Sequence, residues 1–138
     1  MSSSTMLHHV VFAVAPERLD AATEYLEALG FEFQPLELEH LGLQVRLDWD
    51  RGFELISPGP DAPSEPGSAA DFLARQGDGL FTVVVRVESS SAAEDIARRY
   101  GAEADFRQDF EGDGHHLHEV KLTPVAGVPL TLLQTNVH

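Results

Sequence analysis

The first apolar pattern in the chain is an alternation over residues 8–14. It predicts a strand with His9 on one face and Val10 on the other. Apolar residues then recur at helical spacing. They are Leu19, Ala22, Leu26 and Leu29. Pro16 suits the first turn of this helix and Gly30 suits its C-terminal cap, so the start of the chain predicts a strand followed by a helix.

Three further strands and a linker are predicted next. The strand candidates are residues 31–38, 42–49 and 52–57. Residues 58–67 contain four prolines and two glycines, which suppress both helix and strand pairing, so this segment is the one clear linker. A short helix over residues 68–76 follows it, and Ser68 and Asp71 form a plausible N-terminal capping pattern for that helix.

The second half of the chain repeats the order of the first half. A strand at residues 80–87 is followed by a helix at about 91–100, which Ser91 and Glu94 open with the same kind of capping pattern. The apolar stripe of this helix is Ala93, Ile96, Ala97 and Tyr100. The strand candidates after it are residues 103–110, 115–123 and 128–135.

Strand, helix and three strands, used twice, predict an α+β protein of two βαβββ modules in tandem. Module one spans about residues 7–58, the linker and short helix 58–78, and module two about 79–136, within one domain of 138 residues. Each module forms a curved mixed sheet with its helix on one face. Two such sheets enclose a cleft on their uncovered faces, and we expect function there.

The two repeats differ where chemistry is expected. Val14 and Val87 end the two matching strands. His9 lies five residues before Val14, and Thr82 lies five residues before Val87. A histidine in one module therefore corresponds to a threonine in the other. Only the first copy carries an ionisable side chain at this position.

Composition and charge exclude several classes of function. The chain has no cysteine, which excludes disulfides, cysteine-zinc sites and cysteine nucleophiles. Its formal net charge of -14 is spread along the chain and argues against nucleic acid or an anionic membrane as partner. No segment approaches the ~20 apolar residues of a membrane span, so we expect a cytoplasmic protein.

The strand Leu7-His-His-Val-Val-Phe-Ala-Val14, in this order of elements, resembles the vicinal oxygen chelate superfamily, which includes glyoxalases, extradiol dioxygenases and bleomycin-resistance proteins. The segment Phe72-Leu-Ala-Arg-Gln-Gly-Asp-Gly-Leu80, which runs into the second-half strand, is most similar to the methylmalonyl-CoA epimerase branch. The similarity covers nearly the whole chain. It implies the fold more strongly than the activity, because this scaffold hosts many chemistries.

The resemblance also implies a set of metal-binding positions. Enzymes of this superfamily hold a divalent metal with a His and a Glu or Gln from each half. The matching residues here are His9, Glu54, Thr82 and Thr131. A neutral threonine hydroxyl is a poor ligand for Zn, Ni, Co or Mn. We therefore expect no metal site of the usual four-ligand form and name no firm cofactor.

His9 and Glu54 can act without a metal. If both project onto the uncovered face, Glu54 can bond one ring nitrogen of His9 and leave the other to move a proton. Isomerase and lyase chemistry next to a carbonyl needs such a base. The alternative is that the two residues only satisfy each other inside a binding cleft.

The middle strands suggest groups that bind the substrate. Gln44 and Arg46 share one strand face, and Lys121 lies on the polar face of the corresponding second-module strand. If the apolar faces pack under the helices, these polar faces line the cleft. Arg46 and Lys121 would then anchor a carboxylate or phosphate, and Thr82 and Thr131 complete the substrate-binding set. Solvated rim charges are the alternative.

A second cluster of histidines lies in the segment His115-His-Leu-His118. Counting along the strand places His116 and His118 on the face of Val120, away from the predicted cleft. A surface hairpin beginning near Gly112-Asp-Gly114 is the favoured interpretation. A substitute metal site that recruits His115, His116 or His118 is the alternative.

Taken together, the residues and the resemblance predict a small-molecule isomerase, epimerase or lyase in which His9 and Glu54 transfer a proton, without the usual metal. The alternative is a non-catalytic small-molecule binder of the bleomycin-resistance type. The expected partner is a small organic molecule. The resemblance also implies a homodimer.

Overall fold

The computed structural model describes residues 4–137, which fold as two compact units. One unit comprises His9–Phe81, and the other comprises the residues up to His8 together with those from Thr82 onward. The chain contains two βαβββ modules, and the boundaries between the units fall within β1 (Met6–Ala13) and β5 (Gly79–Arg86). The predicted α+β class and the duplication are confirmed. No helix in residues 4–137 is long and apolar enough to cross a membrane.

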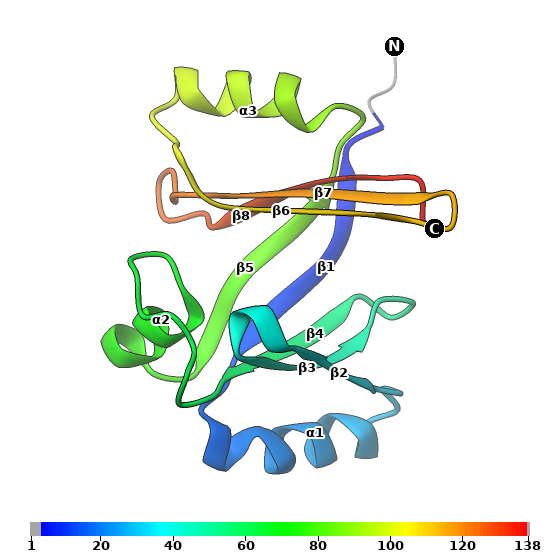
Figure 1. Ribbon diagram of the computed structural model, residues 1–138, viewed down its shortest axis with the longest axis vertical. Helices are drawn as coiled ribbons and strands as arrows, with labels where there is room; N and C mark the ends of the chain where they lie inside the picture. The colour runs from blue at the N-terminus through cyan, green and yellow to red at the C-terminus, as the bar shows by residue number, and fades with distance from the viewer. Residues whose placement is uncertain (1–3, 138) are drawn as a thin grey trace. The chain divides into compact units, whose positions relative to one another are not determined.

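The first module contributes four neighbouring strands to an eight-stranded sheet, with a helix on one face of these strands (Figure 1). The strand order is β2-β3-β4-β1, and β1 runs parallel to β4 while the other neighbours are antiparallel. The elements are β1 (Met6–Ala13), a 3₁₀ turn (Pro16–Arg18), α1 (Leu19–Ala28), β2 (Gln34–Leu38), a second 3₁₀ turn (Glu39–Leu41), β3 (Leu43–Asp48) and β4 (Phe53–Pro58).

The second module repeats this plan with the strand order β5-β8-β7-β6, in which β5 runs parallel to β8. A further helix, α2 (Ala69–Gln76), precedes it, and Ser68 caps α2 by accepting a hydrogen bond from the Asp71 backbone, as predicted. The elements of the module are β5 (Gly79–Arg86), α3 (Ser90–Arg99), β6 (Ala104–Gly112), β7 (His115–Leu122) and β8 (Leu130–Thr135).

The core of the first module lies between α1 and the sheet. Leu19 of α1 packs with Val14 and Leu55, and five aromatic or aliphatic side chains close around them. These are Phe12, Ala22, Leu26, Phe33 and Phe53. The predicted stripe of α1 is therefore correct for its first three members. Leu29 is wrong as a core residue, because it lies at the C-terminal end of the helix and is 65% exposed.

The start of α3 differs from the prediction. Ser89, and not Ser91, is the N-cap, because its hydroxyl accepts a hydrogen bond from the Ala92 backbone at 3.2 Å. Ala93 and Ala97 of this helix pack on the core formed by residues such as Val120 and Leu132, as predicted. Ile96 and Tyr100, which were predicted in this stripe, face solvent instead.

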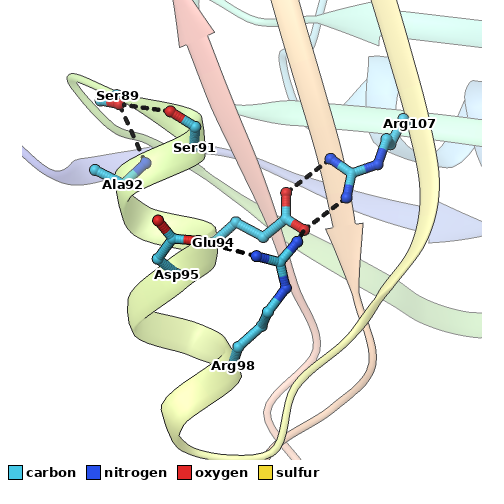
Figure 2. A network of polar contacts seen from close by, with 7 residues as sticks. All are labelled: Ser89, Ser91, Ala92, Glu94, Asp95, Arg98 and Arg107. Atoms are coloured by element: carbon cyan, nitrogen blue, oxygen red, sulfur yellow. Dashed lines mark hydrogen bonds and ion pairs between the residues drawn. The ribbon is translucent and has the colours of Figure 1, made fainter.

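Glu94 does not cap α3 but lies buried beneath it, where two arginines neutralise it (Figure 2). Both guanidinium nitrogens of Arg107, from β6, donate to the carboxylate, at 2.7 and 2.6 Å, and Arg98 donates from the next helical turn. The hydrogen bonds from Arg107 hold the pKa of Glu94 below its usual value. A bidentate guanidinium-carboxylate pair of this kind joins the helix to the edge of the sheet.

Glu94→Gln should lower the free energy of unfolding at pH 7 by about 1–3 kcal/mol, because charge-assisted hydrogen bonds are lost while both arginines keep access to water. The folded-state pKa of Glu94 is depressed, so its contribution is present above the unfolded pKa of about 4.3 and is lost as pH falls through the folded value. Urea unfolding from pH 7 to pH 3 measures this. If the difference in unfolding free energy between wild type and variant stays constant as the pH falls, the prediction is contradicted.

Candidate active site

The candidate site of the first module lies on the sheet face opposite α1. Strand β1 turns Phe12 toward the α1 core, so His9, Val11 and Ala13 point to the other face. Strand β4 lies alongside in parallel, with Val11 paired to Glu54. Because paired residues on neighbouring strands share a face, Glu54 lies on the same face as His9.

His9, Glu54 and Trp49 form one contiguous cluster. The His9 side chain is only 2% exposed, and its Nε2 lies 3.4 Å from Oε1 of Glu54. The Trp49 indole N–H donates to the same Glu54 oxygen at 2.9 Å, and its ring stacks on the His9 ring at a centroid separation of 4.8 Å. The indole therefore fixes the carboxylate and covers the imidazole at once.

Trp49 was not among the site residues predicted from the sequence. The structure shows a single residue that supports both members of the pair. Trp49 follows β3 and Glu54 belongs to β4, and the two lie on either side of the tight turn that joins these strands. The sequence signal for this contact is the separation of five residues between Trp49 and Glu54 around a predicted hairpin.

Chemically, the cluster is a buried imidazole held against a carboxylate that retains some access to solvent. Glu54 has 15% of its side chain exposed, whereas His9 is almost fully enclosed. An imidazole and a carboxylate in contact can pass a proton between them and to a bound molecule. The carboxylate is the member of the pair that a ligand reaches first.

Arg46 and Gln44 do not join this cluster. In the antiparallel pairing of β3 with β4, Leu47 is the partner of Glu54, so the apolar residues of β3 share the His9 face. Arg46 pairs with Leu55 and lies on the opposite face, the one that α1 covers. The prediction that these polar residues line the same face as His9 is therefore corrected, because the apolar side of β3 is turned away from the helix.

The second module carries Thr82 and Thr131 at the register positions of His9 and Glu54. Val84 pairs with Thr131 just as Val11 pairs with Glu54, and Thr82 precedes Val84 by two residues as His9 precedes Val11. Both threonines are buried, and their hydroxyl oxygens lie 2.9 Å apart in a hydrogen bond. The structure thus confirms that the two pairs are equivalent within the repeat.

Lys121 lies beside Thr131 on the same face of the second module. Its ammonium binds Asp105 at 3.0 Å, and both side chains are largely shielded from solvent. Asp105 sits where the pairing of β6 with β7 shifts register, and such a bulge redirects a side chain. The predicted role of Lys121 as an anion anchor stays a prediction. An incoming anion would have to compete with Asp105.

The residues present do not fit the superfamily's four-ligand metal site. In the second module the two positions offer neutral hydroxyls, and these bond each other. Hydroxyls of this kind are weak donors for a transition metal beside imidazole and carboxylate. In residues 4–137 no group of three or more His, Cys, Asp or Glu side chains is arranged to hold a metal ion.

The histidines at residues 115, 116 and 118 lie on a hairpin, which was the interpretation favoured from the sequence. Asp113 and Gly114 both have positive φ, 52° and 77°, and form the two-residue turn between β6 and β7. The rings of His116 and His118 stack at 5.3 Å, and His118 Nδ1 lies 2.8 Å from the Asp109 carboxylate. They share the face of Val120, which packs under α3, so they lie apart from Thr82 and Thr131.

The family model described as a Glyoxalase-like domain matches residues 7–121 of this chain. The chain therefore belongs to the Glyoxalase-like family of the vicinal oxygen chelate superfamily. A search against proteins of curated function found no match.

Solved structures of the same fold include several methylmalonyl-CoA epimerases. A variant of the Streptomyces coelicolor enzyme in complex with 2-nitronate-propionyl-CoA is 21% identical, with a TM-score of 0.70 over 99% of this chain and 100% of that one. The Mycobacterium tuberculosis epimerase is 23% identical, with a TM-score of 0.67 over 97% and 92%. A hypothetical protein from Bacillus halodurans C-125 gives 20% and 0.73 over 98% and 97%. At these identities the likeness shows the fold.

The hydroxyl pair of the second module should behave as one structural unit. Thr82→Val leaves the buried Thr131 hydroxyl without this partner and should cost about 1–3 kcal/mol of unfolding free energy. Thr131→Val should cost a similar amount, and the double variant less than the sum of the two. Urea unfolding of the four proteins measures the coupling. Strictly additive losses would show that the two hydroxyls act independently.

Proposed function

We propose that this protein is a small-molecule isomerase of the epimerase type that moves a proton at a carbon next to a carbonyl. The observation that carries the proposal is the His9–Glu54 contact, with a nearly enclosed imidazole behind a carboxylate that Trp49 holds in place. Membership of the Glyoxalase-like family and the shared fold of the methylmalonyl-CoA epimerases support it.

In this reaction Glu54 takes the proton from the carbon. The C–H bond breaks, its electron pair enters an enolate, and the carboxylate becomes a carboxylic acid that His9 can relieve of its proton. Return of the proton from Glu54 to the same face of the carbon exchanges hydrogen only. Inversion requires that the bound enolate turn its other face to Glu54 before the proton returns, so that one carboxyl group both removes and delivers it. Catalysis of this kind contributes about 10²–10⁴-fold to a rate.

Glu54→Gln should lower the rate of deuterium uptake at the reacting carbon by about 10²–10⁴-fold in D2O, because the amide cannot accept the proton. His9→Gln should lower it as well, and Trp49→Phe by roughly tenfold, since only the hydrogen bond to Glu54 is lost. The probes are methylmalonyl-CoA, a second 2-methylacyl-CoA thioester and a short 2-keto acid, followed by mass spectrometry.

Arg46→Gln is the matched control, because Arg46 lies on the face that α1 covers and its loss should leave exchange unchanged. Exchange by the Glu54→Gln protein at the wild-type rate rejects the catalytic role. If the wild-type protein binds a probe but exchanges no hydrogen with any of them, the isomerase proposal fails.

A non-catalytic binder is the second candidate function. It is favoured by the hydrogen bond between Thr82 and Thr131, because hydroxyls that bond each other leave the second module without an ionisable group at these positions. A binder should show a ligand-dependent rise in melting temperature that Glu54→Gln leaves in place, with no exchange of hydrogen at carbon.

The proposed reaction is independent of metal. Exchange by protein treated with EDTA should match that of untreated protein, and elemental analysis of protein purified without chelator should find no stoichiometric Zn, Ni, Co or Mn. The reason is that two of the four positions that bind the metal in the superfamily carry threonine hydroxyls here, which are weak ligands for these metals. Loss of exchange on chelation, restored by one of these metals, would overturn this part of the proposal.

A further inference from the structure

Four leucines lie on the face of the first-module strands that also carries Glu54. Leu47 of β3 is the direct cross-strand partner of Glu54, so the two side chains share a face. The other three lie at even spacing along β3 and its neighbour β2, and the pairing of β2 with β3 keeps them on that face. This leucine patch comprises Leu36, Leu38, Leu43 and Leu47.

The leucine patch remains accessible beside Glu54. Leu36 lies on the edge strand β2 and is 45% exposed, and the other three leucines are partly exposed. Val45 and Ile56 lie in the same row as Leu36 and are buried. A ligand that reaches the Glu54 carboxylate therefore meets an apolar surface next to it on this module.

The arginines of the first module offer no anchor for an anion on this face. Residues 9–81, all of which the structure describes, contain four arginines and no lysine. Arg46 lies on the face that α1 covers. The other three are each paired with a carboxylate: Arg18 with Asp78, Arg51 with Asp48, and Arg75 with Asp71.

The two cations on the Thr131 face of the second-module strands are also engaged. Arg86 donates to the Thr135 carbonyl at 3.0 Å, and the Lys121 ammonium binds Asp105 at 3.0 Å. A carboxylate on the ligand would in addition lie close to the like charge of Glu54, in a chain with a formal net charge of -14. The charges therefore disfavour an anionic substituent at the reacting carbon.

We propose that the substrate is a carbonyl compound whose reacting carbon carries an uncharged alkyl chain, and that this chain lies on the leucine patch. The inference rests on the proposed function and names its substrate class. An alkyl chain gains free energy from leaving water for the leucines, whereas a carboxylate there would lose hydration without gaining a cation. Ligand sites commonly combine such an apolar wall with a few polar groups.

A matched pair of probes tests the substituent. The thioesters of N-acetylcysteamine with 2-methylbutanoic acid and with methylmalonic acid differ by an ethyl group in place of a carboxylate. The 2-methylbutanoyl probe should bind about tenfold more tightly. The 2-methylhexanoyl thioester, with two more methylene groups, should bind a further three- to tenfold more tightly, at about fourfold for each fully buried methylene. Isothermal titration calorimetry measures the three dissociation constants.

A substitution within the leucine patch tests where the chain lies. Leu36→Lys should remove most of the gain in affinity from the longer chain, and Leu36→Met should keep it, because methionine restores an apolar side chain at this exposed position. Glu37→Gln is the matched control, since it changes the net charge by the same amount at the next residue, on the opposite face, and should leave the affinities unchanged. Unchanged melting temperatures show that the variants fold.

The outcomes separate this inference from the proposed reaction, because binding and deuterium exchange are measured with the same probes. The inference is overturned if the wild-type protein binds the methylmalonyl probe at least as tightly as the 2-methylbutanoyl probe, or binds none of the three. It is also overturned if Leu36→Lys keeps the gain from the longer chain. If the predicted order of affinities holds but no probe exchanges hydrogen, the isomerase proposal fails and the ligand class stands.

Discussion

In both modules the first strand lies parallel to the last strand, and the rest of each module follows from that pairing. Parallel neighbours cannot be joined by a tight hairpin, so the chain must leave, cross one face of the sheet as a helix, and return. In the first module the crossing helix packs its apolar side chains on one face of the sheet, against residues of β1 and β4 such as Phe12 and Leu55. Along each strand, every second side chain points to the other face of the sheet. These side chains occupy the same register positions in each module.

This constraint explains how two modules with one architecture differ so much in chemistry. The pairing of Val11 with Glu54 and of Val84 with Thr131 is backbone geometry, and it is indifferent to the side chain carried. A histidine and a carboxylate in one copy and two hydroxyls in the other occupy equivalent places. The scaffold therefore tolerates replacement of its reactive groups without any change in strand register.

Much of the fold could be predicted, because alternation and helical spacing are local signals. The same signals placed His9 and Glu54 on one face correctly, since β1 and β4 are adjacent and share their register. The face of Arg46 could not be read in this way. The prediction assumed that apolar strand faces pack under helices, yet β3 turns Val45 toward the His9 face, and the polar residue Asp48 on the other face binds Arg51.

Burial of Glu94 was missed for a related reason. A glutamate three residues after a serine reads as a capping residue, and only the distant Arg107 makes its burial favourable. Local sequence carries no record of a partner on another element. Side chains that are neutralised across the fold are therefore the ones most easily misplaced from sequence.

Trp49 is the only tryptophan in the chain, and it contacts both members of the candidate pair. The tryptophan fluorescence of the unlabelled protein therefore originates from within the site. Any event that changes the charge on the stacked imidazole, or withdraws the carboxylate from the indole N–H, alters the surroundings of this one emitter. Occupancy of the site thus has a built-in optical reporter, free of background from other indoles.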